Sequence, residues 1–457
     1  MSQTAQSRFD RNEPGGGVLG SLSNQKGALI GTAILTLAYL LAYCDRTIVT
    51  ILVGPLKKDL GFSDSQVALL IGFSFAIFYS VAGLPLGRLT DAVNRRNLII
   101  AAIVCWSTAT AACGLLNRFP TLLLARVCVG IGEACLVPAA LSMIADYYGP
   151  RGRAKAIAMF VCGAPLGSGL AYLLGGTLLY RLQGSVLPHE WAVLTRFPWQ
   201  LIFLLLGLLG LIVAALLGII SEPPRRFEVL AHEDAHQKES MRRLFASNKG
   251  LLVGVILGPA IMSIAFYALL AWGPTMAVRK FGWGPQQIAL WFTPLGIVSG
   301  LLGPWVGAGS GTLLIRSGHS DGLMRAAVYI AAAAMPLCVA ATMIPFGGVG
   351  IALMFISMGL LIAGITLPQV AIQYIMPNDL RGQVTALFVF CANIIGFGLG
   401  PTIVATLTDH VFHRDSSLNL SLAIVCEAAL LIGGLMTLLH LSHYRAYVAT
   451  GPRGRAA

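Results

Sequence analysis

The chain has 457 residues, of which 56% are hydrophobic and only 11% are charged. Soluble proteins carry about 25% charged residues, so a chain with this composition and a mean hydropathy of +0.78 belongs in a lipid bilayer. Soluble-enzyme, DNA-binding and disordered classes are thereby excluded, and the formal net charge of +12 must be explained by where the basic residues lie.

Apolar runs long enough to cross a bilayer recur along the whole chain, since each helical crossing needs about 20 apolar residues. The sequence predicts twelve spans: 27–53, 65–86, 97–116, 121–146, 154–181, 199–220, 250–278, 285–310, 325–345, 349–376, 382–408 and 419–442. Each run is too long for a strand of a membrane barrel. The first run is also too long for the apolar core of a signal peptide, so we expect it to stay as an anchor.

The placement of lysine and arginine predicts the orientation of the chain. With the N-terminus in the cytoplasm, the cytoplasmic segments carry about 21 basic residues and the outer loops about eight. This bias predicts that both termini are cytoplasmic, and it accounts for the basic charge without nucleic acid. We expect a monomeric, multi-pass protein of the plasma (inner) membrane, with the lipid bilayer and a small substrate as its partners.

A polar stretch at 222–248 divides the chain into two sets of six spans. The predicted organisation is a cytoplasmic tail (1–26), a six-helix bundle (27–221), a cytoplasmic linker (222–248), a second six-helix bundle (249–442) and a cytoplasmic tail (443–457). The segments 148–152 and 376–382 precede spans five and eleven at an offset of roughly 230 residues, which indicates a duplication, although both could be ordinary loop sequences. The predicted fold is all-α, with twelve transmembrane helices in two pseudo-symmetric bundles and a binding site near the midplane between them.

Four ionisable residues lie inside predicted spans: Asp45 and Arg46 in span one, and Arg126 and Glu133 in span four. Counting inward from the outer surface at 1.5 Å per residue, Arg126 is about 8 Å deep, Asp45 about 12 Å and Glu133 about 18 Å. Arg126 and Glu133 are two turns apart and share a helix face. The sequence therefore predicts a polar cluster of two acids and two bases in the wall of a cavity.

Such charges are costly in a bilayer, so they usually serve a function or form pairs. A buried acid beside an arginine can exchange a proton when a substrate displaces the arginine, which is the requirement for proton coupling. An arginine can also bind an anionic headgroup through several hydrogen bonds. The alternative is a pair of static salt bridges. Glu427, in span twelve, has no obvious basic partner and is left out of the site.

The segment 87–96 joins spans two and three and is expected to form a cytoplasmic gate. Gly87 would permit close helix approach, and Asp91 would face the positive end of a neighbouring helix. Arg95 and Arg96 would reach acids at helix ends, with Asp146 as a partner. Arg153, just before span five, belongs to the same predicted gate. The alternative interpretation is a turn that carries positive-inside charges.

Two other features are expected to be structural. The glycine-rich segment 163–169 lies in span five, where small residues suit tight packing or bending. The nine cysteines include no Cys-x-x-Cys pair and accompany no histidine cluster. The sequence therefore predicts no disulfide, metal site or cofactor, with the proton as the coupling ion.

Across its whole length the chain resembles transporters of the major facilitator superfamily. The segment 87–96 is similar to that superfamily's signature between helices two and three, but it has Ala92 where a basic residue is common, and the second half has Ile315 where an acid often stands. Within the superfamily the chain resembles Spinster-type transporters. Three passages carry this resemblance: Ala42-Tyr43-Cys44-Asp45-Arg46, Arg126-Val127-Cys128-Val129-Gly130-Ile131-Gly132-Glu133-Ala134 and Pro165-Leu166-Gly167-Ser168-Gly169-Leu170.

The resemblance implies proton coupling by Asp45 and Glu133 and substrate recognition by Arg46 and Arg126. It implies a secondary active transporter with alternating access, whose cargo is an amphiphilic anion such as a lysophospholipid or a sphingosine-1-phosphate-like lipid. A small organic anion or sugar acid is the alternative cargo. An enzyme or sensor is not expected, because the longest loop carries no nucleophile or metal-binding constellation.

Overall fold

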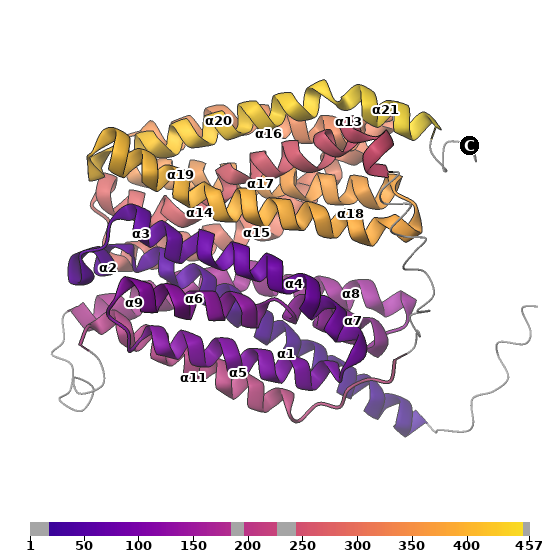
Figure 1. Ribbon diagram of the computed structural model, residues 1–457, viewed down its shortest axis with the longest axis horizontal. Coiled ribbons are helices and arrows are strands. Elements are labelled where there is room, and N and C mark those ends of the chain that lie inside the picture. The colour runs from indigo at the N-terminus through magenta and orange to yellow at the C-terminus, as the bar shows by residue number, and fades with distance from the viewer. Residues whose placement is uncertain (1–17, 184–195, 226–243, 451–457) are drawn as a thin grey trace, which may run out of the picture.

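A computed structural model of the chain describes residues 18–183, 196–225 and 244–450 (Figure 1). Within these residues, twelve helical segments are long and apolar enough to cross a membrane, and each overlaps one of the predicted spans. Helices suit this setting because each satisfies its backbone hydrogen bonds within one segment, where lipid offers no partner. The predicted all-α membrane fold is confirmed.

The helices of the N-terminal half cover the first six spans. They are α1 (Val18–Ile51), α2 (Val53–Leu60), α3 (Asp64–Ala68), η1 (Leu69–Phe73), α4 (Ser74–Ala92), α5 (Arg95–Cys113), α6 (Phe119–Glu133), α7 (Leu136–Tyr147), α8 (Pro150–Val161), α9 (Gly163–Gln183) and α11 (Pro198–Leu217).

The helices of the C-terminal half cover the other six spans. They are α13 (Lys249–Leu252), η2 (Val253–Leu257), α14 (Gly258–Phe281), α15 (Pro285–Arg316), α16 (Gly322–Met343), α17 (Gly347–Ile375), α18 (Asn378–Cys391), η3 (Ala392–Leu399), α19 (Gly400–Thr406), η4 (Leu407–Phe412), η5 (Asp415–Ser417), α20 (Leu418–Leu439) and α21 (Leu441–Thr450).

The two halves lie side by side with their helices roughly parallel (Figure 1). The start of α1 and the end of α21 lie at the same end of the molecule, together with the α4–α5 connection; we call this the linker end. The opposite end, which carries α2 and α3, is called the far end. An even number of crossings requires this common placement of the two chain ends.

Several helices continue past the predicted span limits. Helix α1 begins inside the predicted N-terminal tail, and α21 occupies part of the predicted C-terminal tail. The segment 87–96 was expected to be a loop, but α4 runs to Ala92 and α5 begins at Arg95. The side chain of Asn94 caps α5 by accepting from the backbone N–H of Asn97 at 2.8 Å, so two residues suffice for the turn. Residues 1–17, 226–243 and 451–457 of the predicted tails and linker lie outside the described residues.

The duplicated segments adopt equivalent local structure. Helix α8 begins at Pro150 and α18 at Asn378, each just after the preceding helix ends. In the first half, Arg153 donates to the carbonyl of Ala145 at 3.0 Å; in the second, Arg381 donates to the carbonyl of Met376 at 3.3 Å. Both arginines thus cap the C-terminal end of the preceding helix, which favours cations.

Helix α9 joins the two halves, because it packs against α1 in its own half and against α15 in the other. A side chain on Gly167 would collide with the backbone of Leu40 on α1, and one on Gly169 would collide with Ile297 on α15. Thr293 on α15 also donates to the carbonyl of Gly169 at 3.2 Å. The glycine-rich segment of span five therefore serves tight packing, as the sequence predicts.

Candidate functional site

Asp45 lies on α1 and points into the interior of the N-terminal half. One carboxylate oxygen accepts from the hydroxyl of Thr110 on α5 at 2.6 Å, and the other accepts from Nη1 of Arg126 on α6 at 3.2 Å. The side chains of Asp45 and Arg126 are only 4% and 2% exposed. These contacts join three helices of one half through a buried charge pair.

Arg46 is the next residue on α1 and points to a different side of the helix, because consecutive residues are about 100° apart. Its Nε donates to Oε2 of Glu133 at 2.6 Å. The guanidinium also lies over the rings of Phe75 and Tyr79, both at 4.6 Å, and of Tyr43 at 5.0 Å. Arg46 is thus held by one carboxylate and three aromatic faces, which favour a cation.

Two glycines allow α6 to bring its charged residues this close to α1. A side chain on Gly130 would crowd the backbone of Phe75 on α4, and one on Gly132 would crowd Trp106 on α5. The spacing of these glycines with Glu133 therefore has a packing reason. Helix α6 ends at Glu133 and α7 begins at Leu136, so the glutamate lies at a break within its span.

The two ion pairs leave hydrogen-bonding capacity unused. Oε1 of Glu133 and Nε and Nη2 of Arg126 are buried and have no hydrogen-bond partner among the described residues. A pair that only locked helices together would be expected to use both arms of the guanidinium. Buried polar groups without partners are costly, so these atoms are available to bind another group.

A small pocket of about 50 Å³ lies next to Arg46, between the two halves. The N-terminal half contributes Tyr43, Arg46, Thr47, Thr50 and Ile71, and the C-terminal half contributes Tyr267, Leu270, Ala271, Asn393 and Phe397. The four ionisable residues therefore form two pairs, only one of which lies beside the pocket. Arg46, whose side chain is 15% exposed, reaches the pocket, with fully buried Glu133 behind it, whereas Asp45 and Arg126 are not among the pocket residues.

Sequence reasoning missed the contribution of the C-terminal half to this pocket. Asn393 and Phe397 lie on η3, a stretch of π-helix, and such wider turns are frequent at functional sites. Phe397 packs between Phe75 of the first half and Tyr267 of the second, with ring centroids 5.6 Å and 5.1 Å away. An asparagine within an apolar run was the available signal.

The predicted gate residues bind within the N-terminal half and the segment that follows it. Arg95 is buried and donates to Asp146 at 2.5 Å and to Glu222 at 3.0 Å, so the predicted Arg95–Asp146 contact is present. Arg96 donates to the carbonyl of Ile220 at 2.9 Å, and Arg153 caps α7 as described above.

Two expectations for the gate differ from the structure. Gly87 was expected to permit close helix approach, but a side chain there would meet nothing within 4 Å, because the linker-end part of α4 faces open space. Asp91 was expected to face the end of a neighbouring helix. Its side chain is instead exposed, and it is the backbone carbonyl of Asp91 that accepts a hydrogen bond, from Arg225.

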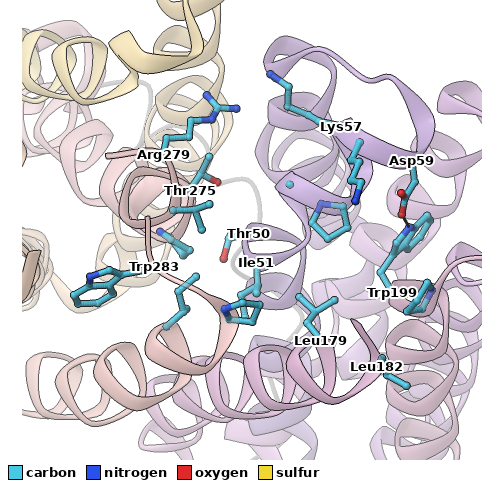
Figure 2. Close-up of a pocket in the computed structure, with 18 of the residues that line it drawn as sticks. Thr50, Ile51, Lys57, Asp59, Leu179, Leu182, Trp199, Thr275, Arg279 and Trp283 are labelled. Atoms are coloured by element: carbon cyan, nitrogen blue, oxygen red, sulfur yellow. Dashed lines mark hydrogen bonds between the residues drawn. The ribbon is translucent and has the colours of Figure 1, made fainter. Parts of the chain in front are cut away.

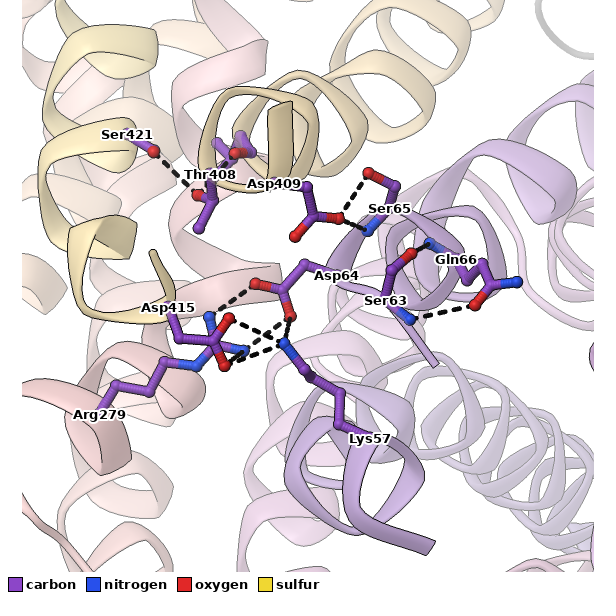
Figure 3. A network of polar contacts seen from close by, with 11 residues as sticks. Lys57, Ser63, Asp64, Ser65, Gln66, Arg279, Thr408, Asp409, Asp415 and Ser421 are labelled. Carbon is purple, nitrogen blue, oxygen red and sulfur yellow. Dashed lines mark hydrogen bonds and ion pairs between the residues drawn. The ribbon is translucent and has the colours of Figure 1, made fainter. Parts of the chain in front are cut away.

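The far end carries a polar network that sequence reasoning did not identify (Figure 3). Asp64, at the start of α3, accepts two hydrogen bonds from Arg279 of the other half at 2.6 and 2.7 Å and one from Lys57 at 2.9 Å. Lys57 also reaches Asp415 at 3.0 Å, and Asp409 accepts from the backbone and hydroxyl of Ser65 at 2.7 and 2.8 Å. This far-end network ties the two halves together.

Glu427 lies outside the site. Glu427 is half-buried on α20, and its Oε1 is buried without a hydrogen-bond partner among the described residues. Within the described ranges, no group of three or more histidine, cysteine, aspartate or glutamate side chains could hold a metal ion.

Comparison with known proteins relates these observations to a family. The family model of the Major Facilitator Superfamily matches residues 35–401. An MFS-type efflux pump of Mycolicibacterium smegmatis is 25% identical over 426 residues, which cover 92% of this chain and 94% of that protein. Protein spinster homolog 1 of Bos taurus is 25% identical over 416 residues, which cover 86% of this chain and 75% of that protein. The hexuronate transporter of Bacillus subtilis is 22% identical over 388 residues, which cover 82% of this chain and 86% of that protein.

Among solved structures, a crystal structure of a bacterial homolog of the human lysosomal transporter Spinster, inward-facing and unoccupied, matches with a TM-score of 0.73. It is 24% identical, and the match covers 92% of this chain and 97% of that one. The resemblance to Spinster-type transporters that the sequence motifs indicated is confirmed by these relatives.

Proposed function

The chain belongs to the Major Facilitator Superfamily of membrane transporters, and we propose that it moves an amphiphilic anion, such as a lysophospholipid or a sphingosine-1-phosphate-like lipid, by proton-coupled alternating access. It is an integral, multi-pass transporter and not an enzyme. We further propose that the linker end faces the cytoplasm and that the protein resides in the plasma (inner) membrane as a monomer, since the positive-inside bias favours this orientation.

The observation that carries the proposal is the Arg46–Glu133 pair. Arg46 reaches the pocket between the halves while Glu133 is fully buried behind it, 2.6 Å away. An anionic substrate in the pocket competes with Glu133 for the guanidinium. A carboxylate that loses its cation in a low-dielectric site is strongly disfavoured, so Glu133 takes up a proton. Substrate binding and proton binding at this site thereby favour each other.

The Asp45–Arg126 pair is proposed as the second element of the coupling. The unpaired Nε and Nη2 of Arg126 supply donors for an anion or for a rearranged Glu133, provided that Asp45 releases the arginine. Thr110 holds the other oxygen of Asp45 at 2.6 Å and keeps that carboxylate in place during the exchange. In this proposal Asp45 and Glu133 carry the proton and the two arginines bind the substrate.

Alternating access requires the halves to separate at one end at a time. The far-end network binds them together at the far end, whereas the contacts of Arg95, Arg96 and Arg153 described above lie within one half and its following segment. We propose that this arrangement belongs to a state closed at the far end. The predicted gate residues at the linker end then act by keeping the N-terminal half rigid as it moves.

A small organic anion or sugar acid is the second candidate cargo. The pocket beside Arg46 is only about 50 Å³ in this state, and a relative is named a hexuronate transporter. A pocket of that size holds no alkyl chain until the halves rearrange. A shift of the melting temperature by hexuronate and none by lysophospholipids would select this cargo class over the lipid.

The test is uptake into liposomes under an imposed pH gradient. Glu133→Gln keeps the size of the side chain and its acceptor for Arg46 but cannot carry a proton, so gradient-driven transport is expected to be lost while the protein stays folded. Asp45→Asn is expected to act in the same way. The matched control is Glu427→Gln, which neutralises a half-buried carboxylate on α20, outside the site. Full gradient-driven activity in both site variants would refute the coupling mechanism.

A further inference from the structure

A second and larger cavity lies at the far end, between the halves (Figure 2). Its volume is about 820 Å³, within the range of about 300–1,000 Å³ that small-molecule sites occupy. Helices α1, α2, α9 and α11 of the first half and α14 and α15 of the second form its walls. We call it the far-end cavity.

The walls of the far-end cavity combine apolar surface with three basic residues, Lys57, Lys58 and Arg279, and two acidic residues, Asp59 and Asp415. Ile51, Leu179 and Leu182 form one apolar side, and Trp283 lies on the other (Figure 2). Lys57 of the first half and Arg279 of the second lie at one edge of the cavity. An apolar enclosure with two cations at one edge is complementary to an amphiphile with an anionic headgroup.

The far-end cavity is distinct from the pocket at Arg46, but the two share one residue, Thr50. Arg46 and Thr50 lie four residues apart on α1, and Gly54 and Lys57 lie on the short helix α2, which begins after an interruption at Leu52. The far-end cavity therefore borders the path from the central site to the far end.

The charges at this edge differ in how easily they can be replaced. Lys57 and Arg279 share two carboxylates, Asp64 and Asp415. The side chain of Asp64 is fully buried and binds Arg279 at 2.6 Å and Lys57 at 2.9 Å, whereas that of Asp415 is 61% exposed and lies 3.0 Å from Lys57 and 3.7 Å from Arg279. An exposed pair of this kind contributes little to stability, so Asp415 is the member that another anion can displace.

We propose that the far-end cavity is a second binding site for a single-chain amphiphile with a phosphate headgroup. The headgroup takes the place of Asp415 between Lys57 and Arg279, and the alkyl chain lies against Trp283 and the apolar side of the cavity. The ligand class rests on the proposed function. The existence of the site does not, because the site is formed by Lys57, Arg279 and Trp283 and not by the Arg46–Glu133 pair.

The test uses Trp283 as a reporter. Protein in nanodiscs of zwitterionic lipid is titrated with dodecyl phosphate that carries bromine atoms on the chain, which quench tryptophan fluorescence on contact. Saturable quenching is expected, and because Trp199 and Trp283 both line the cavity, Trp283→Phe is expected to remove the share of the quenching that comes from Trp283. Inorganic phosphate alone is expected to compete weakly, because it lacks the chain; equal competition by phosphate would show a bare anion site and overturn the amphiphile assignment.

Two charge variants test the headgroup position. Asp415→Asn removes the competing carboxylate and is expected to tighten binding about two- to fivefold, as suits an exposed charge pair. Misfolding cannot mimic a gain of affinity. Lys57→Gln is expected to weaken binding by a similar factor, whereas Lys249→Gln, which removes an exposed lysine at the linker end, is expected to leave it unchanged. Unchanged affinity in Asp415→Asn and unchanged quenching in Trp283→Phe would overturn the proposal.

The same titration separates this site from the central one. Glu133→Gln is expected to lose gradient-driven transport and to keep the quenching by brominated dodecyl phosphate. If transport proved independent of Glu133 while the quenching and its response to Asp415→Asn persisted, the coupling mechanism would fail and the far-end site would stand. Quenching lost in Glu133→Gln would place the ligand at the central pocket and overturn the second site.

Discussion

Arg279 of the C-terminal half binds Asp64 of the N-terminal half through both of its terminal nitrogens, at 2.6 and 2.7 Å. This is the bidentate geometry in which guanidinium–carboxylate pairs are strongest. The acid lies at the first turn of α3, whose positive end further favours a carboxylate. The pair is thus the principal charged connection of the far-end network, and separation of the halves at the far end must break it.

Asp64→Asn is expected to weaken closure at the far end. Arg279 and Lys57 would then share only the exposed Asp415, and breaking a buried pair costs up to about 3–5 kcal/mol. Spin labels introduced as unnatural amino acids at positions 58 and 414 are expected to report a longer mean distance. Asp415→Asn is the matched control and is expected to change the distance little, because an exposed pair contributes about 0–1 kcal/mol. Equal distances in the parent and Asp64→Asn would contradict the role of the pair.

Arg126→Gln is expected to destabilise the fold more than Thr110→Val does. Loss of Arg126 leaves the Asp45 charge buried without a cation, at a cost of about 3–5 kcal/mol, whereas loss of Thr110 removes one hydrogen bond, at about 1–3 kcal/mol. Thermal unfolding in detergent measures both, and Lys58→Gln, at an exposed position, serves as the control. A smaller effect of Arg126→Gln than of Thr110→Val would show that Asp45 does not depend on the arginine.

Gly167→Ala is expected to lower thermal stability sharply, because the new methyl group collides with the backbone of Leu40 and helices α1 and α9 must separate. Gly83→Ala is the matched control: it also lies within a helix, but a side chain there meets nothing within 4 Å. The melting temperature of Gly83→Ala is expected to equal or slightly exceed that of the parent. Similar melting temperatures for the two variants would argue against close packing at Gly167.

Gly87→Ala tests the predicted gate at the linker end. In this structure a methyl group at Gly87 has free space, so the melting temperature is expected to stay unchanged. If the halves meet at Gly87 only when the linker end closes, the variant is expected to slow transport in liposomes without unfolding the protein. Transport at the parental rate would remove Gly87 from the gate.

Asn393→Ala tests whether the C-terminal half contributes to substrate binding in the central pocket. Asn393 lines the pocket beside Arg46 and is only partly buried, so its removal is expected to lower substrate affinity with little change in the melting temperature. The apparent affinity for transport in liposomes measures the effect. Leu270→Ala, at an apolar position of the same pocket, controls for a change of shape alone. Equal effects of both variants would indicate that the amide makes no specific contact.

The spans and the similar depths of the four charged residues could be predicted from the sequence. Long apolar runs leave few alternatives to a membrane helix, and depth counting places residues of different spans at similar heights. Which acid pairs with which arginine could not be predicted from depth. Asp45 and Arg46 are consecutive and point to different sides of α1, so one pairs inside the half and the other beside the pocket. Which side faces which neighbour is decided by packing of whole helices.

The far-end network could not be predicted for a different reason. Lys57, Asp64, Arg279 and Asp415 lie near the ends of apolar runs, where charged residues are usually solvated. The capping box in which Ser63 and Gln66 bind each other's backbone marks the start of α3, but it does not reveal that Asp64 faces the other half. The stretches of π-helix, including η3 with Asn393, also have no distinct sequence pattern.

The interruption of span four has a mechanical consequence. Because α6 ends at Glu133 and α7 begins at Leu136, the Arg46–Glu133 and Arg95–Asp146 contacts belong to two separate helices joined by Ala134 and Cys135. An unbroken rod would transmit any tilt from one contact directly to the other. With two residues between the helices, we expect that α6 can tilt and move Glu133 away from Arg46 while Asp146 on α7 keeps its contact with Arg95.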